Sequence, residues 1–491
     1  MNRLSSLSWQ EVRATFQNIW GYEDFRFPQS EIIHTLLARK DALILMPTGG
    51  GKSICFQLPA LLQTGLTLVI SPLVALMENQ VQELREKRLP AALLHSELSS
   101  LQRRQILQAL ENQKLRLLYL SPETLLSPPV WERLCKPELN ITAIILDEAH
   151  CLVQWGDTFR PAYRRLGAVR RALLKTKPIG TKISVAAFTA TANPDAQKII
   201  QQVLELQKPE VFRLNPYRSN LNPIVRIAWT PNSRRNQLLK FIKNRPQQSG
   251  LVYVRTRHDS EDLAIWLEKL GYQTAAYHAG LGGEERRQIE TNWINDKIQF
   301  VVCTSAFGMG INKPNVRWVV HFHAPLLLSE YVQEIGRAGR DGEPSDALTL
   351  VSEPTGWLDN EDKQRQQFFE NKIREQQQTA QQLIKKLPQQ GQIEAIAQKF
   401  PHSTVALSLL HSNNQLKWLD PFNYIIQLNN PKATTVLNAF SVKTNPQLNA
   451  TKQMHQYLHT KQCRWNFLLN GFGFNQNVEN WHCGHCDNCR I

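Results

Sequence analysis

A glycine-rich segment at residues 46–53 has the residue types and spacing of a phosphate-binding loop. It reads Met-Pro-Thr-Gly-Gly-Gly-Lys-Ser and follows the apolar run Ala42–Leu45. Glycines let backbone N–H groups turn toward an anion, and the N-terminus of a following helix attracts negative charge. Lys52 would then reach the β- and γ-phosphates of a nucleotide, and the Ser53 hydroxyl would ligate Mg²⁺. The other residues expected to hold the nucleotide are Thr48, Gly49, Gly50 and Gly51.

This loop departs from the usual G-x-x-x-x-G-K-S/T pattern in one place, because Met46 stands where the pattern has its first Gly. The alternative interpretation is a glycine-rich turn followed by Lys-Ser by chance.

Two adjacent carboxylates, Asp147 and Glu148, follow the apolar run Ala143–Leu146. At the end of a strand Asp147 can hold Mg²⁺, and Glu148 can orient or deprotonate the attacking water. The alternative is the capped start of a helix, where acidic residues are also favoured. Because the phosphate loop comes first and the acidic pair later, each supports the other. We therefore expect a site for ATP and Mg²⁺.

A third segment, residues 333–342, could act on the same nucleotide. Arg337 and Arg340 are three residues apart, which predicts that they share one face of a helix. Two guanidinium groups from a second domain could close over the γ-phosphate as an arginine finger. Gln333, at the start of the segment, completes the expected catalytic set. The alternative is a solvated basic face.

Four cysteines near the C-terminus have the spacing of a metal site. Thiolates three residues apart on a tight turn chelate one tetrahedral Zn²⁺, and a more distant fourth cysteine closes the site. An iron–sulfur cluster also uses four cysteines, and His482 and His485 are rival ligands for the metal. The expected Zn²⁺ ligands are Cys463, Cys483, Cys486 and Cys489.

The net charge of the chain indicates which kind of molecule it binds. The chain has 491 residues and a net charge of +15, which favours an acidic partner, and nucleic acid is the commonest one. No apolar run is long enough to span a membrane. The N-terminus lacks the apolar core of a signal peptide, so secretion is not expected. The expected location is the bacterial cytoplasm, at the nucleoid, with nuclear residence left open.

Apolar runs alternate with amphipathic stretches, which predicts an α/β fold with two parallel sheets. The first set of expected strands is Ala42–Met46, Leu66–Ile70, Arg116–Leu120, Ala143–Leu146 and Ser184–Phe188. The second set is Leu251–Val254, Gln273–Tyr277, Phe300–Cys303 and Val316–Phe322. We place one lobe at residues 1–208, a second at 209–352 and a helical linker at 353–386.

Residues 387–430 are predicted to form a winged helix. Ile393, Ile396, Ala397 and Phe400 lie at i, i+3, i+4 and i+7, which is one face of a helix. Pro401 ends this helix, and Ser403 can cap a second helix that extends through His411. The expected hairpin comprises Gln415–Leu419 and Phe422–Leu428, joined at Asp420-Pro421.

In a winged helix the second helix can enter the major groove of DNA, and the hairpin can contact the backbone or the fork. Docking of a protein partner and a simple spacer are the alternatives. The expected DNA contacts are Lys399, His402, His411, Lys417 and Trp418.

Taken in this order, the segments resemble a superfamily-2 helicase, and more specifically a RecQ-type DNA helicase. The resemblance runs almost continuously over residues 20–342 and resumes in the last 40 residues. It includes Ser71-Pro72-Leu73, Ser121-Pro122-Glu123, residues 188–192, residues 277–281 and residues 306–314.

The resemblance implies two RecA-like lobes, with Tyr22, Arg26 and Gln29 holding the adenine. It also implies a helical hairpin and zinc module at residues 431–491, in which a helix over Asn449–Leu469 carries Cys463. Relatives often continue past the zinc into a winged helix, so a short form is expected here, in which residues 387–430 replace that domain.

The loop after the acidic pair distinguishes RecQ-type chains from other helicases, and here it spans residues 154–161. Trp155 and Phe159 can stack on unpaired bases, and Arg160 can meet phosphate. The alternative is an aromatic plug in the core. Relatives usually carry His-Asp where this chain has Asp157-Thr158, and that His is thought to link DNA contact to ATP hydrolysis.

The function implied is that of an ATP-dependent 3′→5′ DNA helicase in DNA repair or recombination. The expected partners are single-stranded, forked or tailed DNA, and single-strand-binding or recombination proteins. One alternative is a DNA-stimulated ATPase or translocase with little unwinding activity. Another is a DNA-binding protein without a working motor, against which the intact Lys52, Glu148 and Arg340 argue.

Overall fold

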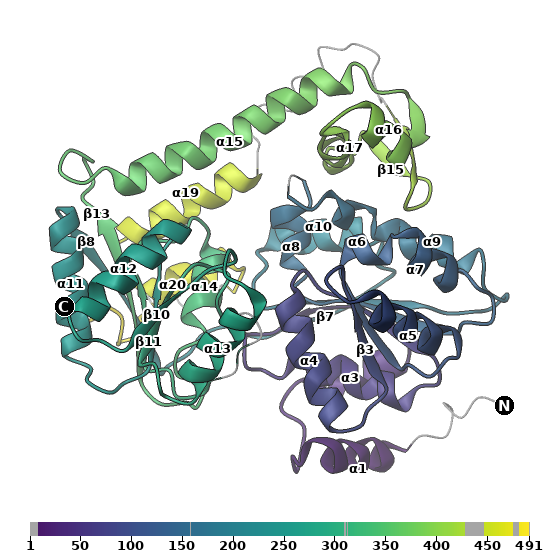
Figure 1. The fold of residues 1–491 in the computed structure, drawn as a ribbon, viewed down its shortest axis with the longest axis horizontal. Helices are drawn as coiled ribbons and strands as arrows, with labels where there is room; N and C mark the ends of the chain where they lie inside the picture. Colours follow the sequence, from purple (N-terminus) through teal and green to yellow (C-terminus); the bar gives the residue numbers. More distant parts are fainter. Residues whose placement is uncertain are drawn as a thin grey trace. The chain divides into compact units, whose positions relative to one another are not determined.

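The computed structural model describes residues 8–427, 446–474 and 481–490, apart from residues 158, 309, 310 and 312. The chain divides into two compact units (Figure 1). The first unit contains Met1–Leu214 and Gln376–Phe440, and the second contains Asn215–Glu375 and Ser441–Ile491. The chain therefore crosses between the units three times, and the second crossing lies within a long helix.

The first unit is built on a parallel sheet in the order β3-β4-β2-β5-β6-β1-β7. Both faces of this sheet are covered: Leu43 and Leu45 point into one core, whereas Ala42 and Ile44 point into the other. Such strands read as continuous apolar runs. The strands are β1 (Ala42–Leu45), β2 (Leu66–Ile70), β3 (Ala91–Leu94), β4 (Leu117–Leu120), β5 (Ile141–Leu146), β6 (Ser184–Thr189) and β7 (Glu210–Arg213).

Helices connect these strands (Figure 1). Several begin at side-chain caps, for example Ser8 and Ser99, each of which forms a capping box with the residue three positions later. The helices are α1 (Trp9–Trp20), α2 (Gln29–Leu37), α3 (Lys52–Leu62), α4 (Val74–Glu86), α5 (Ser100–Glu111), α6 (Pro122–Leu125), α7 (Pro128–Leu134), α8 (His150–Trp155), the 3₁₀ helix η2 (Pro161–Arg165), α9 (Gly167–Leu174) and α10 (Pro194–Val203).

The second unit repeats this design with a parallel sheet in the order β10-β11-β9-β12-β13-β8. Its strands are β8 (Leu221–Ala228), β9 (Gly250–Tyr253), β10 (Thr274–Tyr277), β11 (Phe300–Cys303), β12 (Trp318–His321) and β13 (Ser345–Ser352). Its helices are α11 (Pro231–Lys243), α12 (Arg257–Lys269), α13 (Gly283–Ile294), α14 (Leu328–Ile335), α19 (Pro446–His459) and α20 (Arg464–Gly471). Two parallel-sheet RecA-like lobes are thus confirmed.

The lobe boundary differs from the expected one. Strand β7 pairs with β1, with Glu210 beside Ala42, so the first lobe continues through Leu214 instead of ending at residue 208. The linker is largely one helix, α15 (Glu361–Ile384). In the second unit Arg234 holds the start of this helix, because it pairs with Asp359 at 2.9 Å and with Asp362 at 3.3 Å.

The segment after α15, residues 387–427, is called the insert below. It contains β14 (Gln390–Gln392), α16 (Ile393–Lys399), α17 (Ser403–Ser412), β15 (Leu416–Trp418) and β16 (Asn423–Ile426). The sheet is antiparallel in the order β14-β16-β15. With the end of α15 before it, this is the element order of a winged helix. Residues 428–430 of the predicted segment lie outside the described residues.

Two details of the insert differ from the expectation. The N-cap of α17 is His402 and makes no side-chain hydrogen bond, whereas Ser403 is the first helical residue. Trp418 is 3% exposed and belongs to the core of the insert. An indole that packs this core is not available to DNA, so Trp418 is removed from the predicted contacts.

Within the described residues, none of the helices combines the length and apolar character needed to cross a bilayer.

Candidate nucleotide, metal and DNA sites

The topology of the first sheet brings the phosphate loop and the acidic pair to the same edge. Strand β6 lies between β1 and β5, and all three run parallel. Parallel neighbours end at one edge, which is where ligands bind in open α/β sheets. The phosphate loop follows β1, and Asp147 and Glu148 follow β5. Residues far apart in sequence therefore meet.

Glycine is required in the phosphate loop at Gly51. Its φ is +79°, and a Cβ there would lie 2.4 Å from Gln29 Nε2. Gln29 donates from this nitrogen to the Gly50 carbonyl at 3.2 Å, and its Oε1 accepts from the Arg26 amide at 2.9 Å. The side chain of Gln29 therefore ties the loop to the segment that carries Arg26, and α3 starts directly behind the loop at Lys52.

The Lys52 ammonium is buried and makes no hydrogen bond within the described structure. Its Nζ lies 3.8 Å from Glu148 Oε1, and the two side chains are 12% and 10% exposed. A buried cation without a hydrogen-bond acceptor is costly unless a ligand supplies one. A nucleotide phosphate would supply that acceptor, so the residues present fit ATP at this loop.

Asp147 is held in place beside Lys52. Its carboxylate accepts from Gln80 Nε2 at 3.3 Å and from the Glu148 amide at 3.0 Å. Burial, and then the charge of Glu148, raise the pKa of Asp147 to about 6, although Lys52 opposes the shift. A buried carboxylate of this kind gains from a cation, and the Asp147 carboxylate and the Ser53 hydroxyl are oxygen donors of the kind that Mg²⁺ prefers.

Glu148 has a left-handed backbone, with a φ of +51°. Strained conformations of this kind persist at functional sites when neighbours hold them. His150 is one such neighbour: its Nδ1 lies 3.3 Å from Glu148 Oε2 and 3.2 Å from Thr189 Oγ1. Thr189 ends β6, so the predicted coupling segment at residues 188–192 contacts the acidic pair through His150.

The predicted adenine residues differ in burial. Tyr22 is 52% exposed and Arg26 is also exposed, whereas Gln29 is buried. The Tyr22 ring lies 5.9 Å from that of Phe16, which belongs to the core of α1. An exposed aromatic face and an exposed guanidinium next to the phosphate loop suit a nucleotide base.

Arg337 and Arg340 do not lie on a helix, contrary to the expectation. Helix α14 ends at Ile335, and the chain turns through Gly336 and Gly339, whose φ is +60°. Arg337 is buried and donates to the Gly308 carbonyl, whereas Arg340 donates to the Ile311 carbonyl at 3.0 Å. The three-residue spacing of the two arginines had suggested that the helix continues through them, but the chain leaves the helix at Gly336 and turns again at Gly339.

Three guanidinium groups gather at this turn. Arg218, which the sequence did not single out, donates to the carbonyls of Gly336 and Gly339. Burial, and then the charges of Arg337 and Arg218, lower the pKa of Arg340 to about 10. A half-buried cation that other cations surround is suited to an anionic ligand.

Gln333 is half-buried on α14, and its neighbour Glu334 forms a buried network. Glu334 pairs with Arg255 Nη2 at 3.0 Å and with His321 Nε2 at 2.9 Å. Burial alone would raise the pKa of Glu334, but Arg255 and His321 lower it to about 2. This network, which sequence reasoning missed, holds α14 against β12 and the end of β9.

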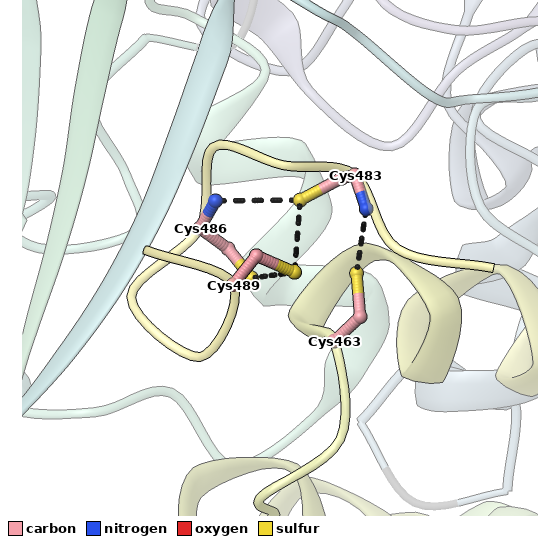
Figure 2. Close-up of side chains that lie close together, drawn as sticks. All are labelled: Cys463, Cys483, Cys486 and Cys489. Atoms are coloured by element: carbon pink, nitrogen blue, oxygen red, sulfur yellow. Dashed lines mark hydrogen bonds between the residues drawn. The ribbon is translucent and has the colours of Figure 1, made fainter. Parts of the chain in front are cut away.

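The four C-terminal cysteines converge, and all their sulfurs lie within 4.8 Å of one another (Figure 2). The Cys486 and Cys489 sulfurs are 3.4 Å apart, and those of Cys483 and Cys489 are 3.8 Å apart. A Zn–S bond of about 2.3 Å implies tetrahedral S···S edges of about 3.8 Å. The cysteines are free thiols, so the set fits Zn²⁺.

Backbone amides support this cluster. The Cys483 amide donates to Cys463 Sγ at 3.3 Å, and the Cys486 amide donates to Cys483 Sγ at 3.3 Å (Figure 2). His485 is excluded as a ligand, because its ring nitrogens contact Tyr217 Oη at 3.1 Å and Asn222 Oδ1 at 3.0 Å. Four thiolates with amide donors match a structural zinc site.

Cys463 was expected within a helix over Asn449–Leu469, but it is the N-cap of α20, after the break between α19 and α20. This position directs its sulfur at the other three. Asp487 anchors the module to the second lobe, because it accepts from the Val225 amide of β8 at 2.8 Å, and it accepts from Arg464 Nε within the module at 2.8 Å. Residues 431–445 and 475–480 of the predicted module lie outside the described residues.

Residues 154–161, here called the aromatic loop, extend from the last two residues of α8 to the start of η2. Phe159 is 70% exposed, and the Arg160 guanidinium lies 5.9 Å from its ring centroid. An exposed Phe beside an Arg is suited to stacking on a base and contacting its phosphate. Trp155 ends α8, but its side chain lies outside the described residues, as does Thr158.

Comparison with known proteins identifies the family. Residues 26–199 match the DEAD/DEAH box helicase model, residues 233–342 the helicase conserved C-terminal domain, and residues 433–490 the RecQ zinc-binding model. The chain is 51% identical to "ATP-dependent DNA helicase RecQ" of Synechocystis sp., over 98% of each chain. The chain belongs to the RecQ helicase family.

Other RecQ-family relatives match the motor region. The chain is 38% identical to "Probable ATP-dependent DNA helicase RecS" of Bacillus subtilis, over 69% of this chain and 66% of that protein. It is 39% identical to "ATP-dependent DNA helicase Q5" of Rattus norvegicus, over 68% of this chain and 36% of that protein.

Solved structures support the fold. Saccharomyces cerevisiae Dbp5 bound to RNA and ADP BeF3 matches 72% of this RecQ-family chain and 89% of its own, with a TM-score of 0.57 at 14% identity. Mycobacterium smegmatis helicase Lhr bound to ssDNA and AMP-PNP matches 72% of this chain and 49% of its own, with a TM-score of 0.55 at 20% identity.

Proposed function

We propose that this chain is an ATP-dependent DNA helicase that moves 3′→5′ along single-stranded DNA, unwinds duplex, and acts in DNA repair or recombination. The observation that carries the proposal is the buried Lys52 ammonium, which has no hydrogen-bond partner in the described structure and lies 3.8 Å from Glu148. Membership of the RecQ family supports DNA as the nucleic acid on which the motor acts. It supports the 3′→5′ direction of movement by analogy.

In this mechanism Tyr22, Arg26 and Gln29 hold the base, and the amides of the phosphate loop with Lys52 hold the phosphates. Ser53 and Asp147 would hold Mg²⁺, which neutralises phosphate charge when bound. Glu148 orients the attacking water and accepts its proton, since its carboxylate lies beside Lys52 and His150.

The second unit contributes positive charge to hydrolysis. Arg340 is the better candidate, because Arg337 is buried at 6% exposure, whereas Arg340 is only half-buried. Gln333 is proposed as a polar contact near the same site. The aromatic loop contacts the unpaired strand through Trp155, Phe159 and Arg160. Cycles of ATP binding and hydrolysis then alternate the grip of the two units on DNA.

The deciding experiment measures ATP hydrolysis and strand separation on one duplex with a 3′ tail, a 5′ tail or no tail. We expect hydrolysis to rise with single-stranded DNA, and only the 3′-tailed duplex to be unwound. Unwinding restricted to the 5′ tail would overturn the direction.

Hydrolysis without strand separation on any duplex would favour the alternative of a translocase with little unwinding activity. DNA binding without hydrolysis would refute the proposed motor.

A further inference from the structure

The insert packs against one side of the first lobe, around η2 and α9. Arg171 Nη2 donates to the Trp418 carbonyl at 2.9 Å, and Arg165 Nη1 donates to the Pro421 carbonyl at 3.2 Å. The Phe422 ring meets that of Trp131 edge-on at 5.3 Å. These contacts place the hairpin of the insert on the lobe, which agrees with its membership of the first compact unit.

The second helix of the insert, α17, also faces the lobe. It packs against η2, and Ala168 of α9 belongs to the same apolar core as Leu409 and Leu410 of α17. Burial, and then the charge of Arg164, lower the pKa of His411 to about 4, so this ring is neutral against the lobe. In a winged helix that reads DNA, the helix equivalent to α17 enters the major groove. Here α17 is packed against η2 and α9 of the first lobe instead.

One contact from α17 reaches the aromatic loop. Ser412 Oγ donates to Asp157 Oδ1 at 2.5 Å, and Arg164 Nε donates to the same oxygen at 2.8 Å. The Arg164 side chain is 4% exposed and that of Asp157 is 19% exposed. A charged acceptor with two donors in a half-buried setting forms strong hydrogen bonds. Asp157 is thereby held from two elements.

The Ser412 hydroxyl has a second acceptor within reach. A hydroxyl has a single proton, and Ser412 Oγ also lies 2.9 Å from the Ser408 carbonyl one turn earlier. The carboxylate is the stronger acceptor while it is present. When Asp157 moves away, the hydroxyl can donate to Ser408 instead, so no buried donor is left without a partner.

Asp157 occupies a position from which loop movement can reach the nucleotide site. It lies between Trp155 and Phe159 in sequence, and α8 connects it to His150. His150 contacts both Glu148 and Thr189. One short helix thus separates the loop that would contact DNA from the carboxylate that would orient water.

We propose that Ser412 and Asp157 form a latch through which the insert positions the aromatic loop and sets the response of ATP hydrolysis to DNA. Ser412 is a positioning residue, because it acts on DNA through the loop. This inference rests on the proposed function and specifies how it is regulated. The insert acts on the motor by packing, not by reading duplex.

The test compares Ser412→Ala with two matched variants in the full chain. Ser408→Ala makes the same change one turn away, where the hydroxyl has no hydrogen bond in the described structure. Ser412→Thr keeps the hydroxyl. Four quantities are measured: the DNA concentration that gives half-maximal ATP hydrolysis, the maximal rate, the melting temperature, and the rate of chymotryptic cleavage after Phe159.

We expect Ser412→Ala to raise the half-maximal DNA concentration about 5-fold, the size expected for one lost hydrogen bond. The maximal rate and the melting temperature should stay unchanged, and cleavage after Phe159 should accelerate because the loop is less restrained. Ser412→Thr should behave as wild type, and so should Ser408→Ala in its DNA response.

An unchanged or lowered half-maximal DNA concentration in Ser412→Ala would overturn the latch, and so would unchanged cleavage. Equal effects of Ser412→Ala and Ser408→Ala would also overturn it, since they would reflect helix stability. The proposed function is judged separately, on wild-type protein: absent DNA-stimulated hydrolysis would refute that function, whereas the cleavage rates would still decide whether the latch restrains the loop.

Discussion

At the scale of single residues, the nucleotide site places a buried cation, which has no hydrogen-bond acceptor in the described structure, beside two buried carboxylates. Lys52 is buried and has no hydrogen-bond acceptor in the described structure, and Asp147 is buried beside Glu148. Burying such groups lowers the stability of the folded protein unless a ligand completes their interactions. The site is therefore preorganised for phosphate and a cation, the arrangement that stabilises a phosphoryl-transfer transition state.

Replacement of Lys52 by Ala, or of Glu148 by Gln, should lower DNA-stimulated ATP hydrolysis by at least about 100-fold, because each change removes charge stabilisation or water positioning. Glu148→Gln should still bind nucleotide, since Ser53 and Asp147 remain. A fluorescent ATP analogue and a phosphate-release assay measure the two effects. Near-normal hydrolysis in either variant would contradict the roles assigned to these residues.

At the scale of elements, small modules are attached to each lobe by specific contacts. The insert packs on η2 and α9, and the cysteine module is anchored by Asp487 to β8 of the second lobe. Each module is small, so its stability depends on these contacts and, for the cysteines, on the metal.

The insert should lose stability as pH falls, because His411 is buried. The pKa of its ring is lowered from 6.5 to about 4 by burial and then by Arg164. The unfolded chain therefore binds more protons between these values, and stability falls as pH drops from about 6.5 toward 4, by up to about 3 kcal/mol.

His411→Leu removes this group, so its melting temperature should fall less than that of wild type between about pH 7.5 and about pH 5. His258→Leu is the control, since the His258 side chain is 80% exposed. Equal pH dependence in wild type and His411→Leu would contradict the assignment.

The cysteine module should contain one Zn²⁺ per chain, and Cys483→Ser should lose it. Loss of a structural metal unfolds a small module, so solubility or DNA affinity should fall. Nucleotide binding should persist, because the phosphate loop lies in the other compact unit. Elemental analysis and nucleotide titration test both points. Iron in place of zinc, or well-folded protein without metal, would refute the zinc site.

At the scale of the whole molecule, hydrolysis is expected to need both units, whereas nucleotide binding needs the first. Arg340 belongs to the second unit, and burial with neighbouring cations lowers its pKa to about 10. A guanidinium beside other cations is stabilised by an anion, and an arginine finger supplies such a positive charge to the transition state.

Arg340→Ala should reduce ATP hydrolysis by at least about 100-fold while changing nucleotide affinity only a few-fold. Arg235→Ala is a suitable control, since it removes an exposed arginine from the same unit. Equilibrium binding and steady-state hydrolysis separate the two effects. If Arg340→Ala hydrolysed ATP at the wild-type rate, the second unit would not supply this charge through Arg340.

Several elements were visible in the sequence because their chemistry is local. Strands β2 and β11 have the predicted bounds, since continuous apolar runs identify buried parallel strands. Strands β3, β7, β8, β13 and β14 were missed, and the first three have identifiable reasons. Two alanines weaken the signal in β3, β7 is mostly exposed at the edge of the sheet, and β8 contains Pro223.

The sequence by itself determined the fold class, the cysteine set and the phosphate loop, because each depends on short-range pattern or ligand chemistry. Only the tertiary structure decided where helices stop and which distant residues meet. Gly336 and Gly339 placed Arg337 and Arg340 in a turn, and the packing of the insert brought Ser412 to Asp157, 255 residues away. Contacts of this range depend on how whole elements pack, and no local pattern of residues specifies that packing.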